Sequence, residues 1–170
     1  MNEYICKIAS LEEMNTKWDY EIAHADEDKD SWIIWKKSHI EHMLEGKSLP
    51  YYGILDGQII SEATAILDGS IAQNSDGLVD EKTAYLSAFR TIPEYQGKGY
   101  FSKLFKFMLK DIKNRGYEKV TLGVEPEETK NKEIYCHYGF IEHIKNGVEV
   151  YPDGTEISVE YYGKNLKEDL

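Results

Sequence analysis

The residues with the clearest chemistry are Gln96-Gly97-Lys98-Gly99, a glycine-rich turn that leads into an amphipathic helix. Apolar residues after the turn recur at the spacing of one helical face, which predicts a helix docked on a core. They are Phe101, Leu104, Phe105, Met108, Leu109 and Ile112. The first N–H groups of a helix lack internal partners and carry about half a positive charge. Because glycine lets a phosphate approach the backbone closely, the turn predicts an anion cradle.

Basic residues concentrate on the same segment. Six of the chain's twenty lysines and arginines lie here, and they are Lys98, Lys103, Lys106, Lys110, Lys113 and Arg115. The last three suit the negative end of the helix dipole, but the first three lie at its positive end, where that explanation fails. Two interpretations stay open, a solvated helix face or contact of at least one of Lys98, Lys103 and Lys106 with a polyanionic ligand.

The composition limits the classes of function. The chain has 170 residues, 41% apolar residues and a formal net charge of −11, which predicts one globular domain over residues 1–170. Such a charge repels nucleic acid and anionic membranes, so neither partner is expected, whereas a cationic substrate is compatible with it. No apolar run is long enough to span a membrane and no signal peptide is expected, so we predict a cytoplasmic protein.

Cysteines and histidines form no metal-binding pattern. Cys6 and Cys136 lie far apart without CxxC spacing, so we expect two buried or half-buried thiols. His39 and His42 lie one helical turn apart, but no Asp, Glu or Cys completes a ligand set at diagnostic spacing. We therefore expect no metal.

Helix and strand patterns alternate around the glycine turn. Strands are predicted at 4–9, 51–55, 58–67, 83–92, 119–124, 140–151 and 156–163. Helices are predicted at 11–22, 31–45, 97–115 and 129–138. Ser10 with Glu13 forms a capping box, and Asp56-Gly57 favours a type I′ hairpin turn. The strand at 83–92 should pair antiparallel with 58–67 and parallel with 119–124. The polar loop 68–81 is expected to act as a lid, and the charged tail after residue 163 is expected to fray.

Glu62 is the one charged residue in a strand that is otherwise apolar on both faces. A carboxylate at such a position must find a partner or shift its pKa. Pairing across the 68–81 loop places Glu62 diagonal to Arg90. We favour a Glu62–Arg90 ion pair slightly over a catalytic role for Glu62.

Three kinds of phosphate site compete for the glycine turn. A Walker loop needs G-x-x-x-x-G-K-[ST], which the chain lacks. A dinucleotide fingerprint needs a third glycine where Ser102 stands, and the antiparallel hairpins do not suit a doubly wound sheet. The segment 93–99 resembles instead the Q/R-x-x-G-x-G/A acyl-CoA loop of the GNAT N-acetyltransferase superfamily. Ile134 to Phe140 is similar to that family's second motif, L-Y-x-x-x-G-F.

The order of elements also looks like that family, so the resemblance covers nearly the whole chain. It implies an α+β fold, an α/β three-layer arrangement with about four helices. The sheet would be mixed and mostly antiparallel, with about seven strands and a central parallel pair that splays apart. The activity it implies is N-acetyl transfer from acetyl-CoA to an amine by direct attack, without a metal. A small-molecule or peptide amine is the implied acceptor, and pairing with a second copy of the chain stays open.

The resemblance also assigns roles to residues. The pyrophosphate of coenzyme A would meet the N–H groups from Gly97 to Ser102 and one of Lys98, Lys103 and Lys106, and the pantetheine arm would follow residues 89–91. The implied cofactor-binding set is Phe89, Arg90, Thr91, Gln96, Gly97, Lys98, Gly99, Tyr100, Phe101, Ser102 and Lys103. Tyr135 matches the tyrosine that protonates the departing thiolate. An N–H near Ala88 and Phe89 would stabilise the oxyanion.

The base that deprotonates the amine stays open between Glu62, Ser87 and Glu125. A non-catalytic acyl-CoA-sensing or protein-binding module on the same fold is the alternative function. The chain departs from the family pattern at Phe101, where a small residue is usual, so its ring points either into the core or toward the pyrophosphate. It also has Glu128 and Asn131 where the family has asparagine and a small residue.

The acceptor pocket is expected between the first two helices, the 68–81 loop and the last hairpin. Trp18, Trp32 and Trp35 belong to this region, which is both acidic and aromatic. That chemistry favours a cationic or amphipathic amine.

Overall fold

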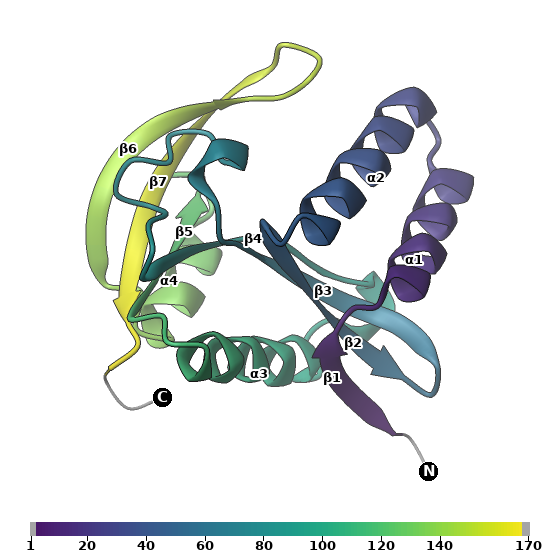
Figure 1. Ribbon diagram of the computed structural model, residues 1–170, viewed down its shortest axis with the longest axis horizontal. Coiled ribbons are helices and arrows are strands. Elements are labelled where there is room, and N and C mark those ends of the chain that lie inside the picture. The colour runs from purple at the N-terminus through teal and green to yellow at the C-terminus, as the bar shows by residue number, and fades with distance from the viewer. Residues whose placement is uncertain (1–2, 168–170) are drawn as a thin grey trace.

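The computed structural model describes residues 3–167 and contains a seven-stranded mixed sheet with helices on both faces (Figure 1). The strand order is β1-β2-β3-β4-β5-β7-β6, and every neighbouring pair is antiparallel except β4–β5. The strands are β1 (Tyr4–Ile8), β2 (Ser48–Leu55), β3 (Gln58–Ile66), β4 (Thr83–Thr91), β5 (Lys119–Val124), β6 (Glu142–Val150) and β7 (Glu156–Asn165). The helices are α1 (Leu11–His24), α2 (Lys29–Leu44), α3 (Tyr100–Asn114) and α4 (Thr129–His137). The fold class predicted from the sequence is confirmed.

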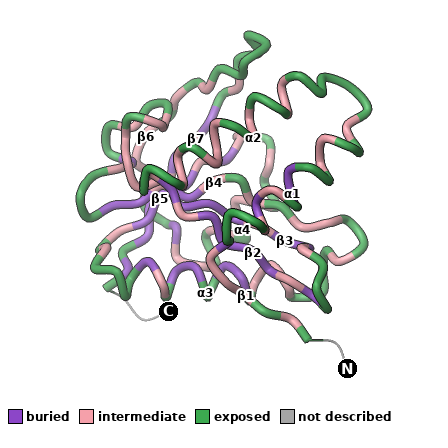
Figure 2. Tube along the Cα trace, turned by 45° about the vertical axis from the view of Figure 1, so that its right-hand side comes forward, coloured by how far each residue is buried: buried purple, intermediate pink, exposed green. Residues whose placement is uncertain are grey.

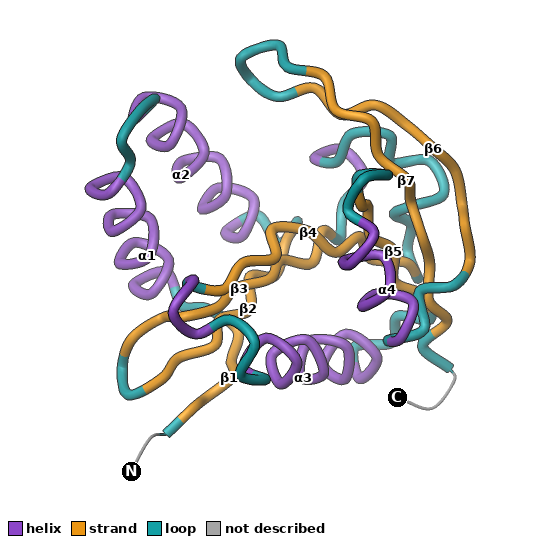
Figure 3. The backbone as a smooth tube through the Cα atoms, turned by 180° about the vertical axis from the view of Figure 1, so that it is seen from behind, coloured by secondary structure: helices purple, strands orange, loops and turns teal. Residues whose placement is uncertain are grey.

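The helices form two separate layers around the sheet. Figure 1 shows α1 and α2 together on one side of β2–β4, with α3 below the sheet on the other side. Seen from behind in Figure 3, α4 lies beside β5. No helix within residues 3–167 has the length and apolarity needed to cross a membrane.

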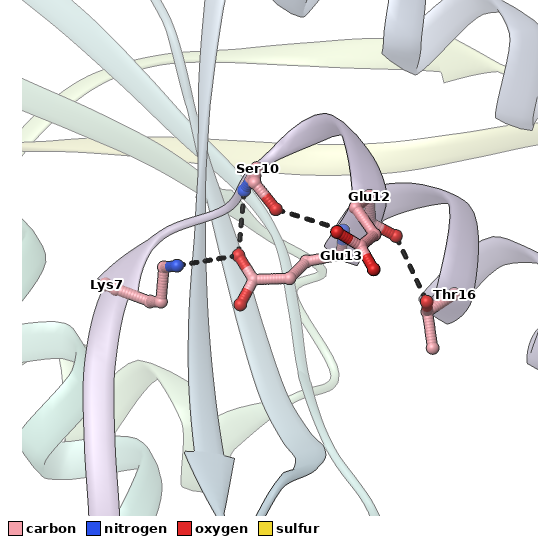
Figure 4. Close-up of polar contacts among 5 residues, drawn as sticks. All are labelled: Lys7, Ser10, Glu12, Glu13 and Thr16. Atoms are coloured by element: carbon pink, nitrogen blue, oxygen red, sulfur yellow. Dashed lines mark hydrogen bonds and ion pairs between the residues drawn. The ribbon is translucent and has the colours of Figure 1, made fainter.

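A capping box starts α1, as the sequence predicts (Figure 4). The Glu13 N–H donates to Ser10 Oγ at 3.1 Å, and the Ser10 N–H donates to Glu13 Oε1 at 2.8 Å. Lys7 Nζ lies 3.0 Å from the same Glu13 oxygen, which ties β1 to the helix start. These contacts satisfy N–H groups that a helix cannot pair internally, and so fix where α1 leaves the sheet.

The face that α1 buries is only partly apolar. Its buried residues are Met14, Lys17 and Trp18, whereas Leu11 remains 43% exposed. The next helix, α2, begins at Lys29 instead of the expected residue 31, and none of its residues is fully buried. The first two helices therefore present a charged and aromatic surface to the sheet.

The main core lies between the sheet and α3. Leu104, Phe105, Met108, Leu109 and Ile112 are all buried, which confirms the predicted apolar face. Figure 2 shows the buried positions concentrated in the central strands and this helix. Each such side chain contributes roughly 1.5–3 kcal/mol on burial, so α3 holds the glycine turn as a fixed point.

The loop between β3 and β4 is held against β6 and β7 by a buried side chain and hydrogen bonds, and it does not form the predicted lid. Leu78 is fully buried, and the Asn74 side chain donates to Val148 O at 2.9 Å and Tyr161 Oη at 3.0 Å. Gln73 makes two further hydrogen bonds with the Val150 backbone on β6. The loop is therefore part of the wall that β6 and β7 form.

The predicted fraying after residue 163 is also wrong for the described residues. Strand β7 continues to Asn165, and Lys164 and Leu166 are buried. The Leu166 N–H donates to Glu118 O at 2.8 Å, which extends the pairing with β5. Only 168–170 of that tail lie outside the described residues.

Candidate active site

The site is built where the parallel strands β4 and β5 separate. They pair from Thr83 opposite Lys119 to Leu86 opposite Leu122, and the pairing stops there. Just beyond, Ala88 adopts a left-handed backbone conformation with φ of 57°, and the β3–β4 register shifts by one residue. Such a bulge bends the strand and is strained for a residue with a Cβ. The bend turns the end of β4 away from β5.

Among residues 3–167, backbone groups on the open side of β4 beyond Leu86 have no strand partner. The Ile92 N–H donates to Ile60 O, so the alternating pattern of a strand directs the backbone of Phe89 and Thr91 away from β3, toward β5. Gln96 Nε2 donates to Thr91 O at 3.0 Å and ties the glycine turn to the strand end. The N–H and C=O of Phe89 and the N–H of Thr91 remain for a ligand.

The glycine turn has the geometry of a cradle. Gly97 and Gly99 adopt left-handed φ of 74° and 87°, and a Cβ at either would meet nothing within 4 Å. In the described part of the chain, the N–H groups of residues 97–102 donate to no carbonyl outside α3. A cavity of about 230 Å³ lies here, lined by residues of 95–102 with Thr91, Ile134 and Tyr138. We call this the phosphate cradle.

Two tyrosines hold the start of α3 in place. Tyr4 Oη on β1 donates to Tyr100 O at 2.9 Å and lies 2.8 Å from Ser61 Oγ. Tyr138 Oη at the end of α4 donates to Ser102 Oγ at 2.5 Å. The cradle is thus fixed from both flanks, and the predicted residues Tyr100 and Ser102 belong to it.

Phe101 points its ring toward the core. The ring stacks on Phe105 with centroids 5.7 Å apart and meets the Phe89 ring edge-on at 5.6 Å. Phe101 also lines the phosphate cradle. Of the two orientations that the sequence left open, the structure therefore has the one in which the bulky ring packs inward.

The lysines near the cradle are exposed and differ in their surroundings. Lys98 Nζ lies 5.9 Å from the Tyr95 ring centroid, close to the turn. Burial raises the pKa of the Cys6 thiol, and the positive charge of Lys103 partly offsets this, so Lys103 lies toward β1. Neither lysine lines the cradle cavity itself.

Tyr135 brings a phenol to the separated strands. Its ring centroid lies 5.7 Å from that of Phe89 and 6.5 Å from that of Phe140. Burial, together with the negative charge of Glu128, raises the pKa of Tyr135 to about 12. The hydroxyl therefore carries its proton at neutral pH and can donate it.

A second cavity, of about 350 Å³, lies between the separated strands, and we call it the splay cavity. Predicted site residues that line it are Ser87, Ala88, Phe89, Glu125 and Tyr135. Glu128, Glu149 and Tyr151 line it as well. The residues that the sequence assigned to proton transfer and to the oxyanion thus share one cavity, apart from Glu62.

The family model described as the Acetyltransferase (GNAT) family matches residues 8–140. The chain belongs to this GNAT family. Among similar solved structures is the ribosomal-protein-S18-alanine N-acetyltransferase of Escherichia coli, 15% identical with a TM-score of 0.71, covering 99% of this chain and 97% of that one. A search of curated proteins gave no match.

Two further GNAT structures show the same fold. A spermidine N-acetyltransferase chimera of Vibrio cholerae SpeG and hSSAT is 15% identical, with a TM-score of 0.69 and 96% of each chain covered. The Salmonella typhimurium protein yncA, solved with its cofactor acetyl-CoA, is 15% identical with a TM-score of 0.65, covering 99% of this chain and 96% of that one. At these identities the likeness concerns the fold alone.

A third cavity of this GNAT protein, about 280 Å³, lies between β4 and the first two helices. We call it the aromatic cavity, and its lining includes Trp18, Trp32, Trp35 and His39. Burial lowers the pKa of His39 to about 4, and the nearby charges of Lys17 and His42 add to this. Among the described residues no group of His, Cys, Asp and Glu could hold a metal ion. His39 is therefore a neutral packing residue against the Trp18 ring, 5.0 Å away.

The predicted Glu62–Arg90 ion pair is wrong. The two residues lie opposite one another on β3 and β4, but Glu62 Oε2 pairs with Lys17 Nζ at 2.9 Å and Arg90 pairs with Glu21 at 2.5 Å. Burial raises the pKa of Glu62, and Lys17 opposes that shift. The side chain of Arg90 thus turns toward α1, away from the phosphate cradle.

Sequence reasoning missed three charged residues of the site. Met14, Lys17, Trp18 and Glu21 follow the i, i+3, i+4, i+7 spacing of one helical face. The sequence could therefore have predicted that Lys17 and Glu21 lie on the inner face of α1. Glu149 has no comparable signal, because its place at the splay cavity follows from pairing between β6 and β7. Cys136 is exposed, contrary to the expected half-buried thiol.

Proposed function

We propose that this GNAT protein, taken as one domain over residues 1–170, transfers the acetyl group of acetyl-CoA to a primary amine. The observation that carries the proposal is that, among the described residues, the N–H and C=O of Phe89 and the N–H of Thr91 have no partner, at a place between the phosphate cradle and Tyr135. A ligand with an anionic end and an extended amide-bearing arm complements this arrangement.

The residues present fit acetyl-CoA, which supplies the reactive thioester. The N–H groups from Gly97 to Ser102 would hold its pyrophosphate, with Lys98 adding a positive charge nearby. The free groups of Phe89 and Thr91 would pair with the amides of its pantetheine arm. Phe101, which packs inward, leaves the backbone N–H groups accessible to the phosphates.

In the proposed reaction the amine nitrogen attacks the thioester carbon directly. A carbon–nitrogen bond forms, the carbon–sulfur bond breaks, and the sulfur leaves as a thiolate. A backbone N–H near Ala88 and Phe89 stabilises the negative charge that develops on the carbonyl oxygen. Tyr135 gives its proton to the thiolate, a base takes a proton from the amine, and both groups return to their starting protonation states by exchange with solvent after the products leave.

Glu62 is the proposed base for the amine. It lines the aromatic cavity together with Ala88 and Phe89, and burial raises its pKa toward the range of a useful base. Ser87 and Glu125 line the splay cavity and are the alternatives.

Release of free thiol from acetyl-CoA tests the proposal. The purified protein is offered a panel of amines, amino acids, polyamines, aminoglycosides and peptides, and release with any of them is the expected result. Tight acetyl-CoA binding without turnover on any acceptor would instead favour the alternative, a non-catalytic acyl-CoA sensor on the same fold.

A further inference from the structure

Glu149 stands at the splay cavity in a position that other side chains fix. Tyr161 Oη donates to Glu149 Oε2 at 2.8 Å, and Tyr85 Oη donates to the same oxygen at 3.4 Å. Asn74 Nδ2 in turn donates to Tyr161 Oη at 3.0 Å. Tyr161 is fully buried, so this support is rigid. The carboxylate is therefore held ready before any ligand arrives.

A glycine makes this support possible. A Cβ at Gly123 on β5 would lie 3.0 Å from Tyr161 Cε1 and 3.0 Å from Tyr85 Oη. The same Cβ would lie only 2.6 Å from Val159 Cγ1, so a larger residue would force Val159 and both rings to shift. The β5 backbone thus leaves room for the two phenols that orient Glu149.

Two more carboxyl groups line the same cavity. The neighbouring carboxyl group of Glu128 is the main cause that raises the pKa of Glu125. Burial, followed by the charges of Glu125, Glu149 and Glu128, raises the pKa of Tyr151, so all three carboxyl groups converge near that ring. None of the three forms an ion pair within residues 3–167.

The attacking nitrogen of the acceptor cannot neutralise the negative charge of Glu125, Glu128 and Glu149 during the reaction. An amine must lose its proton before it attacks a carbonyl carbon, so it is neutral when the reaction begins. A cation that stays protonated throughout the reaction can neutralise the cavity, and such a cation has to belong to another part of the acceptor. The exposed Tyr151 ring beside the carboxylates offers a face to the same group.

We propose that Glu149 determines acceptor specificity by binding a second, permanently cationic group of the amine, with Glu125 and Glu128 completing the site. The acceptor is thus a diamine or a longer polycationic amine. This inference rests on the proposed function for its reaction but concerns binding, so it can be tested apart from turnover.

The test compares an unbranched diamine that has four methylene groups with the monoamine in which a methyl group replaces one ammonium group. Binding is measured by calorimetry, and turnover by thiol release from acetyl-CoA. Wild-type protein should bind the diamine at least about tenfold more tightly than the monoamine, as expected for one charged contact. Glu149→Gln keeps the shape of the side chain and should remove that preference, so that the diamine and the monoamine bind with similar affinity.

Glu127→Gln is the matched control, because Glu127 is exposed in the same turn as Glu128 and does not line the cavity. It should leave both affinities unchanged. Glu128→Gln provides a second variant if Glu149→Gln proves unstable, and should weaken diamine binding more than monoamine binding.

Equal affinity of the wild type for both amines, or no diamine binding at all, overturns the inference even if monoamines are acetylated. Diamine binding that depends on Glu149 supports it even if no thiol is released, an outcome that would count only against the proposed acetyl transfer.

Discussion

Among the thirteen tyrosines of the chain, Tyr135 lies at the point where β4 leaves β5. The hydroxyls of Tyr85, Tyr138 and Tyr161 are committed to hydrogen bonds with neighbouring side chains. Tyr135 has a pKa of about 12, so it is protonated over the whole range in which an enzyme works. A phenol of this kind can give a proton to a leaving thiolate.

Tyr135→Phe should reduce the turnover number by about 100-fold while acetyl-CoA affinity stays nearly unchanged, because only the proton donor is lost. Steady-state kinetics and calorimetry measure the two quantities. In the wild type, the rate should not fall between about pH 7 and pH 10, since Tyr135 titrates only near 12. Tyr117→Phe, on a partly buried core tyrosine, is the control. Unchanged turnover in Tyr135→Phe would remove the assignment.

His39, in the aromatic cavity, makes the stability of the folded protein depend on pH. Burial lowers its pKa from 6.5 to about 4, so the folded state disfavours the charged imidazole. The unfolded chain takes up this proton near pH 6.5, and the folded chain does so only near pH 4. The contribution of neutral His39 to the free energy of unfolding is fully present above about pH 6.5 and is lost as the pH falls toward 4.

Between about pH 7 and pH 4, the free energy of unfolding should therefore drop by about 3 kcal/mol because of His39 alone. His39→Gln should flatten that part of the pH profile, as measured by denaturant titration, while His24→Gln on an exposed position should not. A drop of the same size in the His39 variant would show that other groups cause it.

At the level of elements, the start of α3 is the feature on which the proposed binding of acetyl-CoA depends. Gly97 and Gly116 flank this helix, both have left-handed φ, and neither has an atom within 4 Å of its Cβ position. Valine at either position should cost roughly 1–2 kcal/mol of backbone strain. Only Gly97→Val places a side chain in the phosphate cradle.

Gly97→Val should abolish acetyl-CoA binding in calorimetry, whereas Gly116→Val should bind normally despite a similar loss of thermal stability. The pair separates loss of the cradle from loss of stability. Retained affinity in Gly97→Val would mean that the phosphates bind elsewhere.

Elements set by local chemistry were predictable from the sequence. The capping box at Ser10, the Asp56-Gly57 turn and the apolar stripe of α3 each act over a few residues, and all three are confirmed. Local motifs at a fixed separation also pointed to the glycine turn and Tyr135, whose roles in binding and catalysis stay predictions.

Features set by distant contacts were not predictable. The loop after β3 is fastened by Asn74 to Tyr161, 87 positions away, and no local signal marks that contact. The Glu62–Arg90 prediction failed because each side chain found a partner on α1, which packs over both strands. Glu149 reaches its site through a hairpin register, and sequence spacing alone does not reveal it.

For the molecule as a whole, the net charge of −11 creates a field that favours cations and opposes anions. The phosphate cradle lies at the start of the most basic helix, whereas three carboxyl groups line the splay cavity together with Tyr135. The two ligands of the proposed reaction would thus approach regions of opposite local charge.

The value of kcat/KM for a cationic acceptor should therefore fall as salt is added. From about 0.01 M to about 1 M ionic strength, the Debye length shrinks from about 30 Å to about 3 Å, which removes the long-range attraction. A diamine carries two charges and should lose more than the matched monoamine, because the interaction energy scales with the charge of the ligand. Steady-state rates at saturating acetyl-CoA measure both. Equal salt dependence would mean that the charge of the splay cavity does not guide the acceptor, and that the shape of the aromatic cavity selects it instead.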